Sequence, residues 1–180
     1  MATYFAMIID LTSVVARTKT IEIAFSSAQI DLDIDGTNLT SDARFSGETE
    51  RVGEKAHVRG TVVADVKIDC TRCLEPVERH FEISFDDIFV DPAADTSEIE
   101  VVLGEEQLDE SIAIDGKIDL AEVVREQIIL ALPDQVFCSE DCKGLCPKCG
   151  SNRNLIDCRC IENEIDPRWS ALKDAVNRES

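Results

Sequence analysis

Residues 57–70, HVRGTVVADVKIDC, alternate between apolar and polar side chains. A period of two is typical of a β-strand with one face in the core and the other in solvent. Val63 interrupts the alternation, and Gly60 provides a place for a bend. The stretch therefore predicts one long, bent, half-buried strand. Its expected core positions are Val58, Gly60, Val62, Ala64, Val66, Ile68 and Cys70.

Three shorter stretches alternate in the same way, and turn residues such as Asp35-Gly36 separate them. Because 44% of the residues are apolar but only 5% are aromatic, aliphatic side chains must form most of the core. We expect an antiparallel β-meander or a partly closed barrel. The apolar positions of the three stretches are Ile21, Ile23 and Phe25; Ile30, Leu32 and Ile34; and Phe81, Ile83 and Phe85.

The period changes at Asp119, where DLAEVVREQIILALP carries apolar side chains at helical spacing. Asp119 and Glu122 have the spacing of a capping box, and Pro133 ends the stretch. We expect an amphipathic helix over residues 119–132 that packs on the sheet, so the predicted fold class is α+β. A strand within residues 98–103, EIEVVL, and a short helix over residues 165–176 are also expected.

The chain is strongly acidic, with 18 basic residues, 37 acidic residues and a formal net charge of −19. Residues 133–180 contain 7 basic and 9 acidic residues, a net of −2, so the first 132 contain 11 and 28, a net of −17. Such a surface repels phosphate backbones and attracts a basic partner, although high charge also serves solubility alone. We expect a basic protein partner.

Membrane association is not expected, because no window approaches the roughly 18 consecutive apolar residues of a spanning helix. The apolar start, MATYFAMIIDLTSVV, has no basic segment before it and no signal cleavage site close after it. These features predict a cytoplasmic protein. In a reducing cytoplasm, clustered cysteines indicate metal binding or catalysis rather than structural disulfides.

Six of the eight cysteines lie within residues 138–160, CSEDCKGLCPKCGSNRNLIDCRC. Cys146-Pro-Lys-Cys149-Gly150 has the form of a zinc knuckle, in which two thiolates return to one metal and a glycine permits a positive φ. An iron–sulfur cluster, disulfides or free thiols are the alternatives. We expect a structural zinc site in this tail, since a closed all-thiolate site has no open position for substrate. The candidate ligands are Cys138, Cys142, Cys146, Cys149, Cys158 and Cys160.

A second pair, Cys70-Thr-Arg-Cys73, lies between two predicted strands. It has three interpretations: half of a second metal site completed from the tail, a structural hairpin closure, or a thiol redox pair. A redox pair is typically placed at the start of a helix, whereas a strand is expected here. The domain organisation that follows is an acidic β-rich body over residues 1–133 and a cysteine-rich zinc module with a short C-terminal helix over residues 134–180.

No motif for enzymatic catalysis accompanies these cysteines. The chain contains two histidines, and it lacks the nucleophile-elbow, P-loop and dinucleotide-binding patterns. We therefore expect a non-enzymatic protein without a small-molecule substrate. Direct RNA binding would need the cations around the knuckle, helped by Arg168 and Trp169. Those cations are Lys143, Lys148, Arg153 and Arg159.

Taken in order, CTRCLEPV at 70–77, IDLAEVVREQIILALP at 118–133, the cysteine-rich stretch and IDPRWSALKDAV resemble the YceD family of large ribosomal RNA subunit accumulation proteins. The resemblance covers roughly residues 40–176. It implies a role in the accumulation of large-subunit ribosomal RNA, and genes of this family often neighbour that of a large-subunit ribosomal protein. The family's six-cysteine tail is present in some members and absent from others. The family's motif positions would be Cys70, Arg72 and Cys73, followed by Asp119, Leu120, Leu130 and Pro133.

The residues and the resemblance together favour a ribosome-biogenesis factor that binds a basic ribosomal protein or assembly factor. Direct binding of ribosomal RNA, or thiol redox activity at Cys70 and Cys73, are the alternatives.

Overall fold

The computed structural model of the protein describes residues 8–11, 18–53, 55–90 and 110–160. Five strands form one sheet in the spatial order β2-β4-β5-β6-β7, and β3 pairs with the far part of β5. β1 and β8 form a separate two-stranded sheet. The elements are β1 (Ile8–Asp10), β2 (Lys19–Phe25), β3 (Thr37–Leu39), β4 (Ala43–Val52), β5 (Lys55–Asp69), β6 (Pro76–Val90), β7 (Glu110–Ile112), β8 (Lys117–Asp119) and α1 (Leu120–Ala131).

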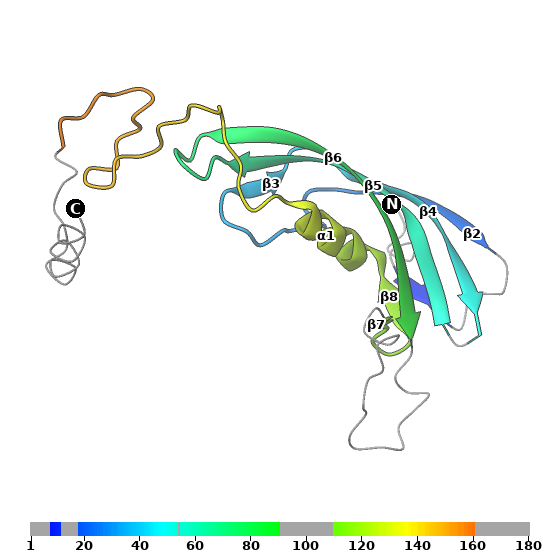
Figure 1. The fold of residues 1–180 in the computed structure, drawn as a ribbon. Helices are drawn as coiled ribbons and strands as arrows, with labels where there is room; N and C mark the ends of the chain where they lie inside the picture. Colours follow the sequence, from blue (N-terminus) through cyan, green and yellow to red (C-terminus); the bar gives the residue numbers. More distant parts are fainter. Residues whose placement is uncertain (1–7, 12–17, 54, 91–109, 161–180) are drawn as a thin grey trace, which may run out of the picture.

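The large sheet is open. β2, β4, β5 and β6 pair antiparallel, whereas β7 runs parallel to β6. In the described part of the chain, β2 and β7 are the two edges and do not pair with each other. The expectation of a partly closed barrel is therefore wrong. Figure 1 shows the physical reason: the sheet curves over α1, so the helix, and not closure of the sheet, covers its apolar face.

The long hairpin of β5 and β6 is the centre of the fold, and it contains the alternating stretch read from the sequence. Val58, Val62 and Val66 are completely buried on the side of the sheet that faces α1. Phe45 of β4 packs beside Phe85 of β6, with ring centroids 5.7 Å apart. This apolar face is the core of the protein.

Helix α1 begins where the sequence indicates. Asp119 is its N-cap, and its side chain accepts a hydrogen bond from the Ala121 backbone N–H at 2.9 Å. Glu122, the expected partner in a capping box, accepts from the Arg125 side chain at 3.0 Å. The buried face of the helix rests on the sheet, as its periodicity predicts. That face consists of Leu120, Ala121, Val123, Val124 and Ile128.

The stretch around Ile30 and Leu32 is a correction to the sequence analysis, which predicted a strand. Both side chains are buried, but the backbone forms no strand and instead crosses beside the helix. Arg125 donates to the carbonyl oxygens of Asp31 and Leu32, at 2.6 and 3.4 Å. Asp33 has a positive φ of 52° and Ile34 is 39% exposed, so the buried alternation ends at Leu32. The buried side chains lie beside a helix and not beside a neighbouring strand.

Two predicted elements, the strand within 98–103 and the helix over 165–176, lie outside the described residues, as do Arg168 and Trp169. The division into a body and a cysteine-rich module stays a prediction. In the described ranges, α1 is the one helix, and it is too short and too polar to cross a bilayer.

Candidate metal centres

The eight cysteines lie in two groups of four, at the end of the molecule formed by the β5–β6 turn and the segment after α1. Within each group, all four Sγ atoms lie within 4.8 Å of one another. Tetrahedral Zn–S bonds of about 2.3 Å require S–S separations of about 3.8 Å. The first group has Sγ–Sγ distances of 3.8 and 3.5 Å, so both groups could hold a metal ion. The first group is Cys70, Cys73, Cys138 and Cys142, and the second is Cys146, Cys149, Cys158 and Cys160.

The first two cysteines of each group lie in a Cys-x-x-Cys turn, and the two turns have the same backbone hydrogen bonds. In the second group, the Cys146 N–H donates to Ser151 at 2.9 Å, and the Gly150 N–H donates back to Cys146 at 2.8 Å. The corresponding bonds in the first group are Cys70 to Glu75 at 2.8 Å and Leu74 to Cys70 at 2.9 Å. The Cys-x-x-Cys turn between β5 and β6 is thus a second knuckle.

Leu74 occupies the position that Gly150 occupies in the other knuckle. Both residues have a positive φ, 61° for Leu74 and 71° for Gly150. Leucine is strained in this conformation, whereas glycine adopts it readily. The sequence did not indicate this second knuckle, because leucine stands at the position where a glycine typically follows such a turn.

The first group joins the sheet to the segment that follows the helix. The Thr71 N–H donates to the Val136 carbonyl at 2.8 Å, and the Leu145 N–H donates to the Arg72 carbonyl at 2.8 Å. The Arg72 guanidinium lies 4.1 Å from the centre of the Phe137 ring and donates to a backbone carbonyl at Cys142, 3.0 Å away. Arg72 therefore holds both sides of the junction, a role that the sequence analysis did not identify.

Hydrogen bonds favour the thiolate form of two cysteines in the first group, Cys70 and Cys142. Burial raises the pKa of Cys70, but N–H groups of Arg72, Cys138 and Cys73 outweigh it and lower that pKa to about 6. The Asn154 amide, whose Nδ2 lies 3.3 Å from the Cys142 sulfur, lowers the pKa of Cys142. Backbone donors aimed at sulfur are typical of knuckle turns that bind metal.

The second group has the same electrostatic pattern and is more exposed. Ser151, through its hydroxyl and its N–H, lowers the pKa of Cys149 to about 6. Backbone N–H groups of Cys149 and Lys148 lower the pKa of Cys146. The sulfurs of Cys149 and Cys146 raise the pKa of Cys160 to about 12, because a further thiolate beside them is unfavourable. A bound cation removes that penalty, so this donor set suits a metal.

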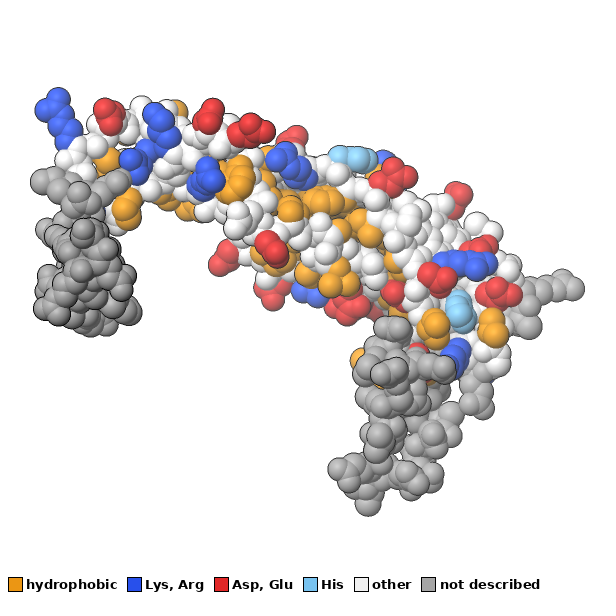
Figure 2. All heavy atoms as spheres, in the orientation of Figure 1, with side chains coloured by type: hydrophobic (Ala, Val, Ile, Leu, Met, Phe, Trp, Pro, Cys, Tyr) orange, Lys and Arg blue, Asp and Glu red, His pale blue; other side chains and the backbone are white. Residues whose placement is uncertain are grey.

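The four basic residues that the sequence offers for RNA contact lie within residues 143–159, around the cysteines of the second group. Figure 2 shows Lys and Arg side chains at this end of the molecule. Lys143, Lys148, Arg153 and Arg159 are all exposed. The Lys143 N–H donates to the Asn154 side chain, which ties its backbone to the loop that holds Cys142.

The Cys70 and Cys73 side chains are 0% and 4% exposed and belong to a four-sulfur group. Reactive redox thiols are typically partly exposed, so this burial favours the metal-site interpretation of Cys70 and Cys73 over the redox alternative. The structure also brings Cys138 and Cys142 to the β5–β6 turn and away from the other tail cysteines. Sequence spacing could not select these partners; the one signal was that eight cysteines divide into two sets of four.

The described residues form an open sheet with one covering helix, and they carry two four-thiol groups that could each hold a metal ion. No catalytic constellation is found among these residues. The chain matches the model of "Large ribosomal RNA subunit accumulation protein YceD" over residues 58–174. It belongs to the YceD family. That family is named as an accumulation factor, which supports a role in ribosome biogenesis.

Relatives in several organisms are similar over most of the chain. An uncharacterised protein of Mycobacterium tuberculosis is 33% identical, covering 86% of this chain and 72% of its own length. Protein YlbN of Bacillus subtilis is 29% identical, covering 79% and 83%. A chloroplastic large ribosomal RNA subunit accumulation protein YCED homolog of Zea mays is 24% identical, covering 87% and 60%. No solved structure matches the chain.

Proposed function

We propose that the protein is a non-enzymatic ribosome-biogenesis factor that promotes accumulation or processing of large-subunit ribosomal RNA. The observation that carries this proposal is the family match over residues 58–174. In the proposed mechanism, the acidic body binds a basic ribosomal protein or assembly factor. The net charge of −19 supports a protein partner over a phosphate backbone. The proposed place of action is the cytoplasm, where clustered thiols stay reduced.

Two zinc ions, one in each four-thiol group, are part of the proposal. Zinc bound by four thiolates supplies structure and no open coordination position. Cys70 and Cys73 from the sheet, with Cys138 and Cys142 from the later segment, would fasten that segment to the β5–β6 turn. Cys146, Cys149, Cys158 and Cys160 would close the exposed knuckle loop. The cysteines themselves hold the metal, and no reaction is assigned to them.

The partner is tested by isolating tagged full-length protein from cells that lack the untagged copy, with and without nuclease treatment. We expect basic ribosomal proteins or assembly factors to remain bound after nuclease. We also expect depletion of the protein to reduce large-subunit ribosomal RNA relative to small-subunit RNA. Normal RNA levels after depletion would refute the function.

The RNA alternative is separated by a variant in which the four knuckle cations become Gln. The protein-partner mechanism expects this variant to restore large-subunit RNA as well as wild type does. Loss of all ribosomal proteins on nuclease treatment, together with failure of the variant, would favour direct RNA contact. The substituted residues are Lys143, Lys148, Arg153 and Arg159.

The metals are tested by elemental analysis of anaerobically purified protein, for which we expect two zinc ions per chain, one for each group. Cys70→Ser and Cys160→Ser change different groups, so each should reduce the content to one. Cys70→Ser should lower the unfolding temperature more, because its group joins the sheet to the segment after α1. A single zinc in wild type, or loss of both ions in either variant, would contradict the two-site assignment.

A further inference from the structure

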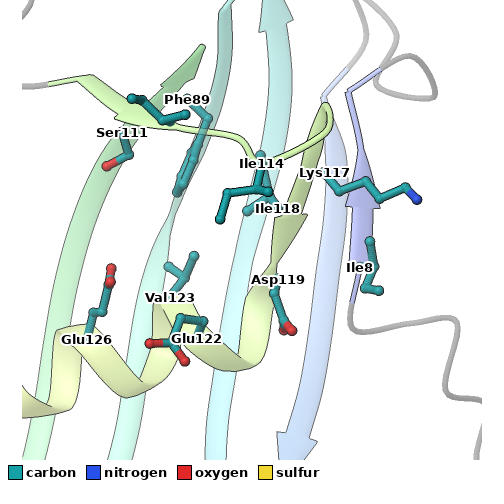
Figure 3. A pocket seen from close by; sticks show the side chains of 11 residues that line it. Ile8, Phe89, Ser111, Ile114, Lys117, Ile118, Asp119, Glu122, Val123 and Glu126 are labelled. Atoms are coloured by element: carbon teal, nitrogen blue, oxygen red, sulfur yellow. The ribbon is translucent and has the colours of Figure 1, made fainter. Parts of the chain in front are cut away.

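A groove lies at the end of the sheet opposite the metal centres, between α1, β7 and β8. It has a volume of about 410 Å³. Figure 3 shows its arrangement: Phe89, Ile118 and Val123 form an apolar floor, and Ser111 lies at one end. The groove is separate from both four-thiol groups and contains none of their cysteines.

Strand β7, the turn after it and β1 contribute large, exposed apolar side chains to the lining of the groove. Ile112 and Ile114 are 63% and 76% exposed, and Ile8 at the far end is 48% exposed. Single exposed apolar residues are ordinary, but three exposed isoleucines lining one groove with an apolar floor add up to an apolar surface. Leaving this surface in water is unfavourable, and an apolar partner would bury it.

The opposite wall of the groove is acidic. Asp119, Glu122 and Glu126 succeed one another along one side of α1, at spacings of three and four residues. The Glu122 carboxylate accepts a hydrogen bond from the Arg125 side chain. The same guanidinium also donates to backbone carbonyl oxygens of the loop beside the helix. Among the described lining residues, Lys117 is the one cation, and Figure 3 shows its side chain directed away from the carboxylates.

We propose that this groove is the docking site for a basic amphipathic segment of a protein partner. Apolar side chains of the segment would cover Ile112, Ile114 and the floor, while Lys or Arg side chains one helical turn apart would meet Glu122 and Glu126. Charge complementarity selects this occupant, because an acidic or phosphate-bearing partner would be repelled by the same wall. The inference rests on the proposed function, since it locates the surface that binds the basic partner.

The probe for this site is a synthetic helical peptide of about 18 residues, with Leu on one face and Lys on the other. Its affinity for the full-length protein is measured by fluorescence anisotropy. Glu122→Gln/Glu126→Gln and Ile112→Ser/Ile114→Ser should each weaken binding about tenfold. The substituted side chains are exposed, so both variants should unfold at the wild-type temperature.

A matched control removes two carboxylates elsewhere. Glu22 and Glu82 are exposed on the face of the sheet away from α1, and Glu22→Gln/Glu82→Gln changes the net charge equally. This control should bind the peptide within about twofold of wild type. Equal weakening by the control and Glu122→Gln/Glu126→Gln would show attraction by net charge alone, and would overturn the docking site.

Other occupants of the groove give different results. If another segment of this chain fills it, wild type will not bind the peptide. If a second copy fills it, wild type will be a dimer by sedimentation velocity, and Ile112→Ser/Ile114→Ser will be a monomer. Either result would overturn the proposal.

Co-isolation with the same variants separates this inference from the proposed function. Undiminished recovery of ribosomal proteins by both groove variants refutes the docking site and leaves the function intact. Groove-dependent peptide binding, together with normal large-subunit RNA levels after depletion of the protein, supports the docking site and refutes the function.

Discussion

Gly60→Ala is expected to be among the most damaging small changes in the protein. Gly60 of β5 pairs directly with Gly47 of β4, and the Phe45 ring lies over the pair. A Cβ at Gly60 would lie 2.6 Å from Phe45 Cε2, 2.6 Å from the Ser46 carbonyl oxygen and 2.7 Å from Gly47 Cα. Carbon atoms in favourable contact are about 3.5–4.0 Å apart. The added methyl group therefore needs about 1 Å of movement from its neighbours.

The cost follows from which atoms must move. Two of the three obstacles are backbone atoms of β4, so they can retreat only if β4 and β5 separate. Overpacking a core typically costs about 1–3 kcal/mol, and we expect about 3 kcal/mol here. For a protein of this size, that corresponds to a fall of about 6–12 °C in the unfolding temperature.

The assay is thermal and urea unfolding of Gly60→Ala beside Gly53→Ala. Gly53 has a φ of 68°, and among the described residues no atom lies within 4 Å of the position that a Cβ would take there. Gly53→Ala thus carries only the conformational cost, about 1 kcal/mol. In a Phe45→Leu background the penalty at Gly60 should shrink, since part of the clash is with the ring. Equal destabilisation by the two alanine variants would refute the packing argument.

Three further changes test other local features. Leu74→Gly should stabilise the metal-bound protein by about 0.5–1 kcal/mol, because it removes a positive φ from leucine; a lower unfolding temperature would contradict this. Thr49→Val should stabilise by about 1 kcal/mol in urea unfolding, because the buried Thr49 hydroxyl has no hydrogen-bond partner among the described residues; no gain would disprove that cost. Burial raises the pKa of Asp87, so wild type loses stability as pH rises through that folded pKa. Asp87→Asn should therefore be more stable than wild type at neutral pH, with the difference vanishing below about pH 4; a pH-independent difference would oppose this account.

The sequence by itself determined the features that depend on near neighbours. The alternation in residues 57–70 predicted β5, because a strand exposes every second side chain. Asp119, helical spacing and Pro133 located α1 closely, because caps and stops act within one turn. The Cys146–Cys149 spacing indicated a knuckle for the same reason, and the order of motifs along the chain identified the family.

Only the tertiary structure decided which distant parts meet. Ile30 and Leu32 alternate like a strand, but a helix and not a neighbouring strand supports them. Cys70 and Cys73 lie beside Cys138 and Cys142 because the turn of the long β5–β6 hairpin lies next to the segment after α1. The open sheet edge likewise arises from elements far apart in the chain, as does the groove with its apolar floor and acidic wall. A local sequence pattern indicates whether each side chain is buried or exposed. Packing of the whole chain decides which distant residues that side chain contacts.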